Sequence, residues 1–103
     1  MAETLRYIIV GTGGFGGTWC QEFLPRLATV GKARVVAAVD LDPSALLNAQ
    51  QYLGLPPERC YADIQRAFDE NPADFAIVVV PPASHERVVD VALEHGCNIL
   101  SEK

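Results

Sequence analysis

The segment from Gly11 to Gly17 combines residue types and spacing that could bind a phosphate group. Five of its seven residues are glycine, and Gly11-Thr12-Gly13-Gly14-Phe15-Gly16 reads G-x-G-x-x-G. The motif follows an apolar run and precedes residues at helical spacing, which is the context of loops that bind the pyrophosphate of a dinucleotide. In such loops the first glycine turns the chain out of a strand, the second admits the phosphates, and the third lets the helix pack against the strand. Free N–H groups at the start of the helix favour the anion.

A carboxylate follows at the spacing that such a site requires. Asp40 ends a second apolar run, 24 residues beyond Gly16. A carboxylate there can accept both hydroxyls of an adenosine ribose, and it repels a 2′-phosphate. Neighbouring Leu41 and Asp42 offer no cation to such a phosphate, so the pattern favours NAD over NADP.

Plainer interpretations of both features stay open at this point. The glycine loop could be a tight turn without a ligand, or a site for a different mononucleotide, and Asp40 could be a surface residue that caps a helix. A phosphate loop of the Gly-Lys-Ser/Thr kind is excluded because no such triplet follows the glycines.

Alternating strands and helices are predicted to position these residues. Apolar runs predict strands at Leu5–Val10, Val35–Val39, Cys60–Tyr61, Phe75–Val80 and Asn98–Leu100. Helices are expected from Phe15 onward, from Pro43 to Gly54 with Asp42 as cap, from Asp63 to Phe68, and from Ala83 or Ser84 to Gly96. Pro25 should kink or end the first helix. Strands that are apolar on both faces belong to a parallel sheet covered on both sides, so we predict one doubly wound α/β domain of the Rossmann type.

Composition excludes several other classes of protein. The 103 residues carry a net charge of -5, which argues against nucleic acid or an anionic membrane as partner. No apolar run is long enough to span a bilayer, and the acidic start does not resemble a signal peptide, so we expect a cytoplasmic protein. Cys20, Cys60 and Cys97 are odd in number and lack C-x-x-C spacing, which predicts reduced thiols and no metal site.

The C-terminal third carries a resemblance to a known family. Pro81 and Pro82 follow a buried strand, His85 comes three residues later, and the last strand ends in Glu102-Lys103. With the glycine loop and Asp40, this pattern resembles the N-terminal domain of the glucose-fructose oxidoreductase, inositol dehydrogenase and rhizopine catabolism family (Gfo/Idh/MocA). The resemblance covers nearly the whole chain. The sequence departs from the family pattern at Val80, where Thr is usual, and in lacking the proline after Glu-Lys.

The resemblance implies a role for each matching residue. Lys103 would hold the substrate and assist proton transfer, and Glu102 is its partner in the family signature. Pro81 and Pro82 would pack against the cofactor, with His85 on the nicotinamide side, and Phe15 could touch the cofactor from the loop. Without the resemblance, His85 would be a surface or capping residue and Lys103 a solvated tail.

The function that the resemblance implies is that of a cofactor domain. The whole protein would transfer a hydride between NAD(P) and a hydroxyl-bearing carbon of a sugar, cyclitol or similar polyol. We expect residues 1–103 to be the dinucleotide-binding domain, truncated before the last strand, with the family's C-terminal substrate domain absent. Alone it should bind a dinucleotide without turning over a substrate, and a homo-oligomer through the missing domain stays open. The alternatives are a non-catalytic dinucleotide-sensing regulator on the same fold, and a different Rossmann enzyme.

Overall fold

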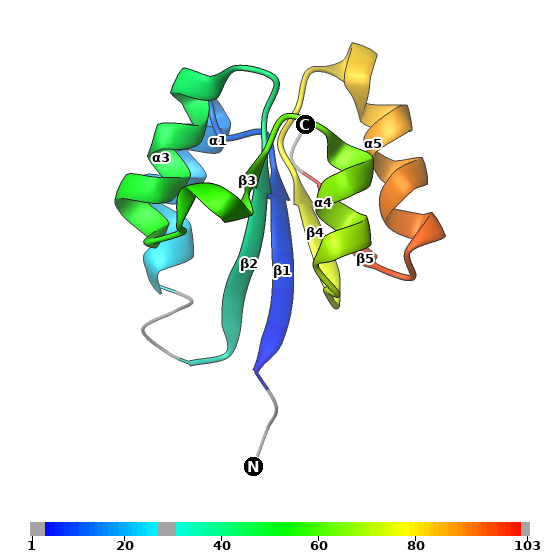
Figure 1. Ribbon diagram of the computed structural model, residues 1–103, viewed down its shortest axis with the longest axis horizontal. Helices are drawn as coiled ribbons and strands as arrows, with labels where there is room; N and C mark the ends of the chain where they lie inside the picture. The colour runs from blue at the N-terminus through cyan, green and yellow to red at the C-terminus, as the bar shows by residue number, and fades with distance from the viewer. Residues whose placement is uncertain (1–3, 27–30, 102–103) are drawn as a thin grey trace.

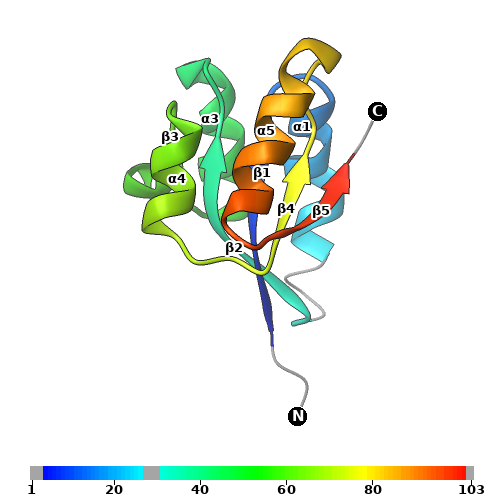
Figure 2. The same cartoon turned by 90° about the vertical axis from the view of Figure 1, so that its right-hand side faces the viewer.

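A computed structural model describes residues 4–26 and 31–101. In these ranges five parallel strands form one sheet in the order β3-β2-β1-β4-β5. The strands are β1 (Leu5–Val10), β2 (Ala33–Val39), β3 (Cys60–Tyr61), β4 (Phe75–Val78) and β5 (Asn98–Ser101). Figure 2 shows β5 beside β4 at one side of the sheet. The predicted doubly wound topology is confirmed, and its strand order changes direction between β1 and β4, where ligands bind in open α/β sheets.

Helices cover both faces of the sheet (Figure 1). On one face lie α1 (Phe15–Thr18), the π-helical turn η1 (Trp19–Phe23) and α3 (Pro43–Leu53); on the other lie α4 (Ile64–Glu70) and α5 (Pro82–Glu94). A 3-10 turn, η2 (Pro57–Arg59), precedes β3. Successive strand residues point to opposite faces, so Ile8 and Val10 are buried with α4 and α5, whereas Tyr7 and Ile9 are buried with η1 and α3.

The helix ends follow from local residue chemistry. The Asp42 carboxylate accepts the Ser44 N–H at 2.9 Å, and Asp63 does the same for Gln65 at 3.0 Å, so both predicted caps are present. The last helix begins at Pro82, earlier than predicted, because a proline at the first helical position gives up an N–H that has no partner there. β4 ends at Val78, although the Val79 N–H still reaches the Val10 carbonyl at 2.9 Å.

The first helical segment continues through Pro25. The backbone widens to a π-helical turn over Trp19–Phe23, and helical backbone continues to Arg26. The Leu24 N–H donates to the carbonyl of Trp19, five residues earlier. Proline lacks an N–H and its ring crowds the carbonyl four residues before it, and the wider turn accommodates both. The prediction that the helix ends at Pro25 is therefore wrong, whereas a kink there stays a prediction.

The described residues contain no helix that is long and apolar enough to cross a membrane. They also contain no group of three or more His, Cys, Asp or Glu side chains arranged to hold a metal ion. Cys20, Cys60 and Cys97 are free thiols, and burial raises the pKa of Cys20 to about 12. That thiol is therefore protonated and a poor nucleophile near neutral pH.

His95 links the C-terminal end of α5 to α4. Its Nδ1 lies 2.8 Å from the Val91 carbonyl, and its Nε2 lies 2.7 Å from Oδ1 of Asp69. Both ring nitrogens thus face acceptors, which favours the doubly protonated imidazolium. These hydrogen bonds, first to Val91 and then to Asp69, raise the pKa of His95 above its usual value.

The raised pKa of His95 makes stability depend on pH. The stabilisation is complete below the unfolded-state pKa of about 6.5 and is lost as pH rises through the higher folded-state pKa. Between about pH 6 and pH 9, the free energy of unfolding should fall more in the wild type than in His95→Gln. Urea unfolding of both proteins at the two pH values measures this. Equal pH dependence would show that the imidazolium contacts contribute nothing.

Candidate functional site

A pocket of about 640 Å³ lies at the carboxyl ends of the strands. It is lined by segments that follow four strands: Gly11 and Gly13 after β1, Asp40 to Asp42 after β2, Ala62 to Ile64 after β3, and Val79 to Pro81 after β4. The first residues of α5 complete the wall. The fold thus brings four of the predicted site residues, Gly11, Gly13, Asp40 and Pro81, to one cavity.

The backbone of the glycine loop requires glycine at its first position. Gly11 has a φ of +95°, and a Cβ there would lie 2.0 Å from the Val79 carbonyl oxygen. The loop can therefore cross β4 only without a side chain at this residue. At Gly13 a Cβ would contact Ala45 at 3.2 Å and come within 4.0 Å of Asp40, so a larger side chain would fill this part of the pocket.

Asp40 connects the glycine loop to the end of β2. Its Oδ2 accepts the Thr12 N–H at 2.9 Å and the Gly13 N–H at 3.3 Å, and its Oδ1 accepts the Asp42 N–H at 2.9 Å. One carboxylate thus joins two loops that are 27 or 28 residues apart in the chain. Each carboxylate oxygen has about two acceptor sites, and Oδ1 accepts one N–H among the described residues, that of Asp42, so Oδ1 keeps capacity for a further donor.

Thr12 lies beneath the loop and not on its open side. Its side chain is buried, its hydroxyl lies 3.4 Å from Oδ2 of Asp40, and its carbonyl accepts a hydrogen bond from Asn48 of α3 at 2.8 Å. A Cβ at Gly17 would lie 3.0 Å from Nδ2 of Asn48, so a fifth glycine allows this contact. Neither Asn48 nor Gly17 was predicted as a site residue, although Gly17 directly follows the motif.

The loop residue Gly14 is open to its surroundings. It has a φ of +56°, and a Cβ on it would contact nothing within 4 Å. Among the described residues, no acceptor faces its N–H. Gly14 is exposed and no side chain shields its N–H, so this N–H can donate to an anionic oxygen. This part of the loop therefore fits a pyrophosphate.

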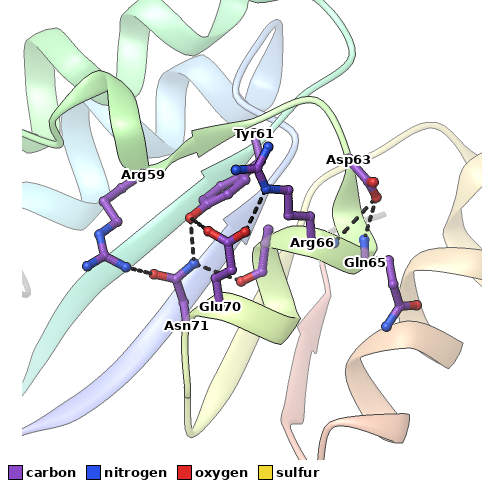
Figure 3. A network of polar contacts seen from close by, with 8 residues as sticks. Arg59, Tyr61, Asp63, Gln65, Arg66, Glu70 and Asn71 are labelled. Atoms are coloured by element: carbon purple, nitrogen blue, oxygen red, sulfur yellow. Dashed lines mark hydrogen bonds and ion pairs between the residues drawn. The ribbon is translucent and has the colours of Figure 1, made fainter.

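A polar network holds the wall of the pocket that β3 and α4 form (Figure 3). The buried Tyr61 donates its hydroxyl to Glu70 at 3.0 Å, and Nδ2 of Asn71 donates to the same hydroxyl at 3.1 Å. Arg59 completes the network by donating to Oδ1 of Asn71. These contacts tie the end of β3 to the end of α4, while the Asp63 cap holds the start of α4 at the pocket.

The remaining predicted site residues lie away from this pocket or outside the described part of the chain. Pro82 begins α5 and is exposed, and Nε2 of His85 lies 2.5 Å from the Ser101 hydroxyl at the end of β5. Neither residue lines the pocket. Only the backbone of Phe15 and Gly16, within α1, is described. Glu102 and Lys103 lie outside the described residues.

The charges around the pocket are mostly negative. Asp40, Asp42 and Asp63 line it, and Arg87 of α5 is the one cation among the described lining residues. Hydrogen bonds from Ser44 hold the pKa of Asp42 below its usual value, so that carboxylate stays ionised. Arg87 was not predicted as a site residue, although helical spacing places it on the same face as Ala83 and Ser84, which also line the pocket.

Comparison with known proteins agrees with this geometry. The family Gfo/Idh/MocA, described as an oxidoreductase family with an NAD-binding Rossmann fold, matches residues 5–103. The chain belongs to this family. The resemblance inferred from the glycine loop and the C-terminal motifs is thereby confirmed, and the chain matches the family's NAD-binding Rossmann fold.

Relatives of this Gfo/Idh/MocA domain include both sequences and solved structures. The chain is 45% identical over 100 residues to "Uncharacterized protein y4oX" of Sinorhizobium fredii, covering 97% of the chain and 28% of that protein. It is 28% identical over 103 residues to an inositol 2-dehydrogenase of Corynebacterium glutamicum, covering 100% of the chain and 29% of that enzyme. The scyllo-inositol dehydrogenase of Lactobacillus casei, solved with NAD(H) and scyllo-inositol, matches with a TM-score of 0.77 and 25% identity over 98% of the chain and 28% of that enzyme. The chain thus spans less than a third of these relatives.

Two glycines of the loop should differ sharply in their tolerance of a methyl group. Gly11→Ala should lower the free energy of unfolding by about 4 kcal/mol or more, because the new Cβ meets a backbone carbonyl. Gly14→Ala should cost only about 1–2 kcal/mol, since its Cβ meets no atom and only the left-handed backbone is strained. Urea unfolding of the two variants measures the difference. Similar losses would mean that the loop does not pass so close to Val79.

Proposed function

We propose that this domain holds NAD for a dehydrogenase that moves a hydride between the nicotinamide and a hydroxyl-bearing carbon of a sugar, cyclitol or similar polyol. The observation that carries the proposal is the position of Asp40, whose carboxylate meets the glycine loop at the edge of the pocket. Two features that recognise different parts of one dinucleotide are therefore side by side. In this proposal residues 1–103 form the cofactor domain, and a second domain supplies most of the substrate contacts.

The glycine loop and Asp40 would bind neighbouring groups of NAD. The pyrophosphate would lie against Gly13 and Gly14, where the second glycine leaves room and the N–H of Gly14 is open. The adenosine ribose would donate hydrogen bonds from its hydroxyls to Asp40, chiefly to Oδ1, because Oδ2 already accepts from Thr12 and Gly13. Bound NAD would supply the hydride acceptor or donor, and the protein would supply its orientation.

The charge of the pocket supports NAD in preference to NADP. A 2′-phosphate on the ribose would lie beside Asp40 and near Asp42, and both carboxylates would repel it. The ribose hydroxyls of NAD would instead donate charge-assisted hydrogen bonds to the same carboxylate.

The strand order changes direction between β1 and β4, and the nicotinamide would lie on the β4 and β5 side of this point. His85 contacts Ser101 there, at the end of the strand that leads to Glu102 and Lys103. Pro81 and Pro82 would pack against the cofactor between the two sides, and Phe15 would approach it from the loop. Lys103 would hold the reacting hydroxyl of the substrate and move its proton as the hydride leaves. The inositol dehydrogenases among the relatives support a polyol substrate.

Asp40 should determine both the affinity for NAD and the choice between cofactors. In the full-length protein, Asp40→Asn should weaken NAD binding by about 1–3 kcal/mol and reduce the preference over NADP. Titration of NADH and NADPH, followed by nicotinamide fluorescence, measures both effects. Asp63→Ala is the matched control, because that carboxylate lines the pocket but caps α4. Tighter binding of NADPH than of NADH by the wild type would contradict the assignment of Asp40.

Lys103 should act in the chemical step and not in cofactor binding. In the full-length protein, Lys103→Met should lower kcat/KM for an inositol or sugar substrate by at least about 100-fold, because the ammonium no longer assists proton transfer. NAD affinity should stay nearly unchanged. Steady-state kinetics and NADH titration of the same variant test the two parts separately. If Lys103→Met keeps wild-type turnover, Lys103 takes no part in the chemical step. If Lys103→Met loses NAD binding instead, Lys103 is a cofactor ligand.

A further inference from the structure

Arg87 faces the pocket from α5. The residues of α5 that line the cavity are Ala83, Ser84, Arg87 and Val88, a spacing that forms one face of the helix. That face looks across the cavity toward the segments that follow β2 and β3. Arg87 thus lines the same cavity as Asp40 and Leu41, but from a different element of the fold.

The guanidinium of Arg87 is available to a ligand. In the ranges 4–26 and 31–101, the side chain of Arg87 forms no hydrogen bond or ion pair, whereas the side chain of Arg6 pairs with Asp74 and that of Arg66 pairs with Glu70. The carboxylates that line the pocket are each engaged by backbone N–H groups: Asp40 in the glycine loop, Asp42 at the start of α3, and Asp63 at the start of α4. The cation thus shares a cavity with three carboxylates and is paired with none of them.

The surroundings of Arg87 are suited to a flat aromatic ring. Leu41, Ile64, Val80 and Val88 line the same cavity. Leu41 is 84% exposed, so its apolar side chain is open to a ligand in the cavity. These four apolar side chains, called the apolar slot below, lie in the same cavity as the unpaired guanidinium of Arg87. Together they provide a stacking surface for a heteroaromatic base.

We propose that Arg87 stacks on the adenine ring of the dinucleotide and is an affinity determinant for the adenosine end of the cofactor. The inference rests on the proposed binding of NAD at Asp40, because the ribose held there places its base in the slot beside Arg87. A guanidinium offers a flat, weakly hydrated face that packs on a base, and its charge is attracted to the ring. A contact of Arg87 with phosphate oxygens is the competing explanation, and it requires charge without planarity.

Binding measurements on the full-length protein separate stacking from a phosphate contact. The variants are Arg87→Leu, Arg87→Lys and the control Arg34→Leu, in which an exposed arginine of β2 outside the pocket is replaced. NADH and NADPH are titrated directly, and adenosine, which carries the ring and ribose without phosphate, is measured as a competitor of NADH. Stacking predicts that Arg87→Leu weakens NADH and adenosine by the same factor, about 3- to 30-fold. Arg87→Lys should recover only part of the loss, and Arg34→Leu should change nothing.

Three results would overturn the role of Arg87. Unchanged adenosine affinity together with weaker NADH or NADPH binding would assign Arg87 to phosphate. Full recovery by Arg87→Lys would show that charge alone matters, and unchanged binding of all three ligands by Arg87→Leu would remove Arg87 from the site. Asp40→Asn in the same series tests the proposed function separately. If wild type binds NADH and Asp40→Asn weakens it while Arg87→Leu does not, only the stacking inference fails; if wild type does not bind NADH, the proposed function fails.

Discussion

The carboxylate of Asp40 is the interaction on which the rest of the site depends. It accepts N–H groups from Thr12 and Gly13 on one side and from Asp42 on the other. The loop after β1 and the loop after β2 are thereby held at a fixed separation, without help from a ligand. A loop rich in glycine would otherwise sample many backbone states, so this contact lowers the entropy that binding must remove.

Contacts at the end of β4, on α3 and at the start of α4 hold the segments that border the pocket. Gly11 lets the loop cross β4 at a distance that no side chain permits, and Asn48 of α3 holds the carbonyl of Thr12. Tyr61 and Asn71 tie β3 to the end of α4, and Asp63 caps the start of α4 that borders the pocket. Rigid elements would therefore place each proposed contact with the dinucleotide, while the loops would carry the contacts themselves.

Local chemistry explains which features could be predicted from the sequence. Apolar runs predict the strands, and Asp42 and Asp63 cap their helices as expected, because these effects act within a few residues. The π-helical turn before Pro25 could not be predicted, since the pattern does not say whether a helix ends, kinks or widens at a proline. The burial of Thr12 and the approach of Arg87 to the pocket depend on how helices dock on the sheet, which no local spacing specifies.

A crystal structure of the full-length protein with NAD tests the central claim most directly, since it shows what each oxygen of the dinucleotide contacts. We expect the adenosine ribose hydroxyls within hydrogen-bond distance of Asp40 and the pyrophosphate against the backbone of Gly13 and Gly14. The contact between Asp40 and Thr12 should persist, because the loop is already in its binding geometry. A dinucleotide bound with its ribose away from Asp40, or a glycine loop that makes no contact with the pyrophosphate, would contradict the account.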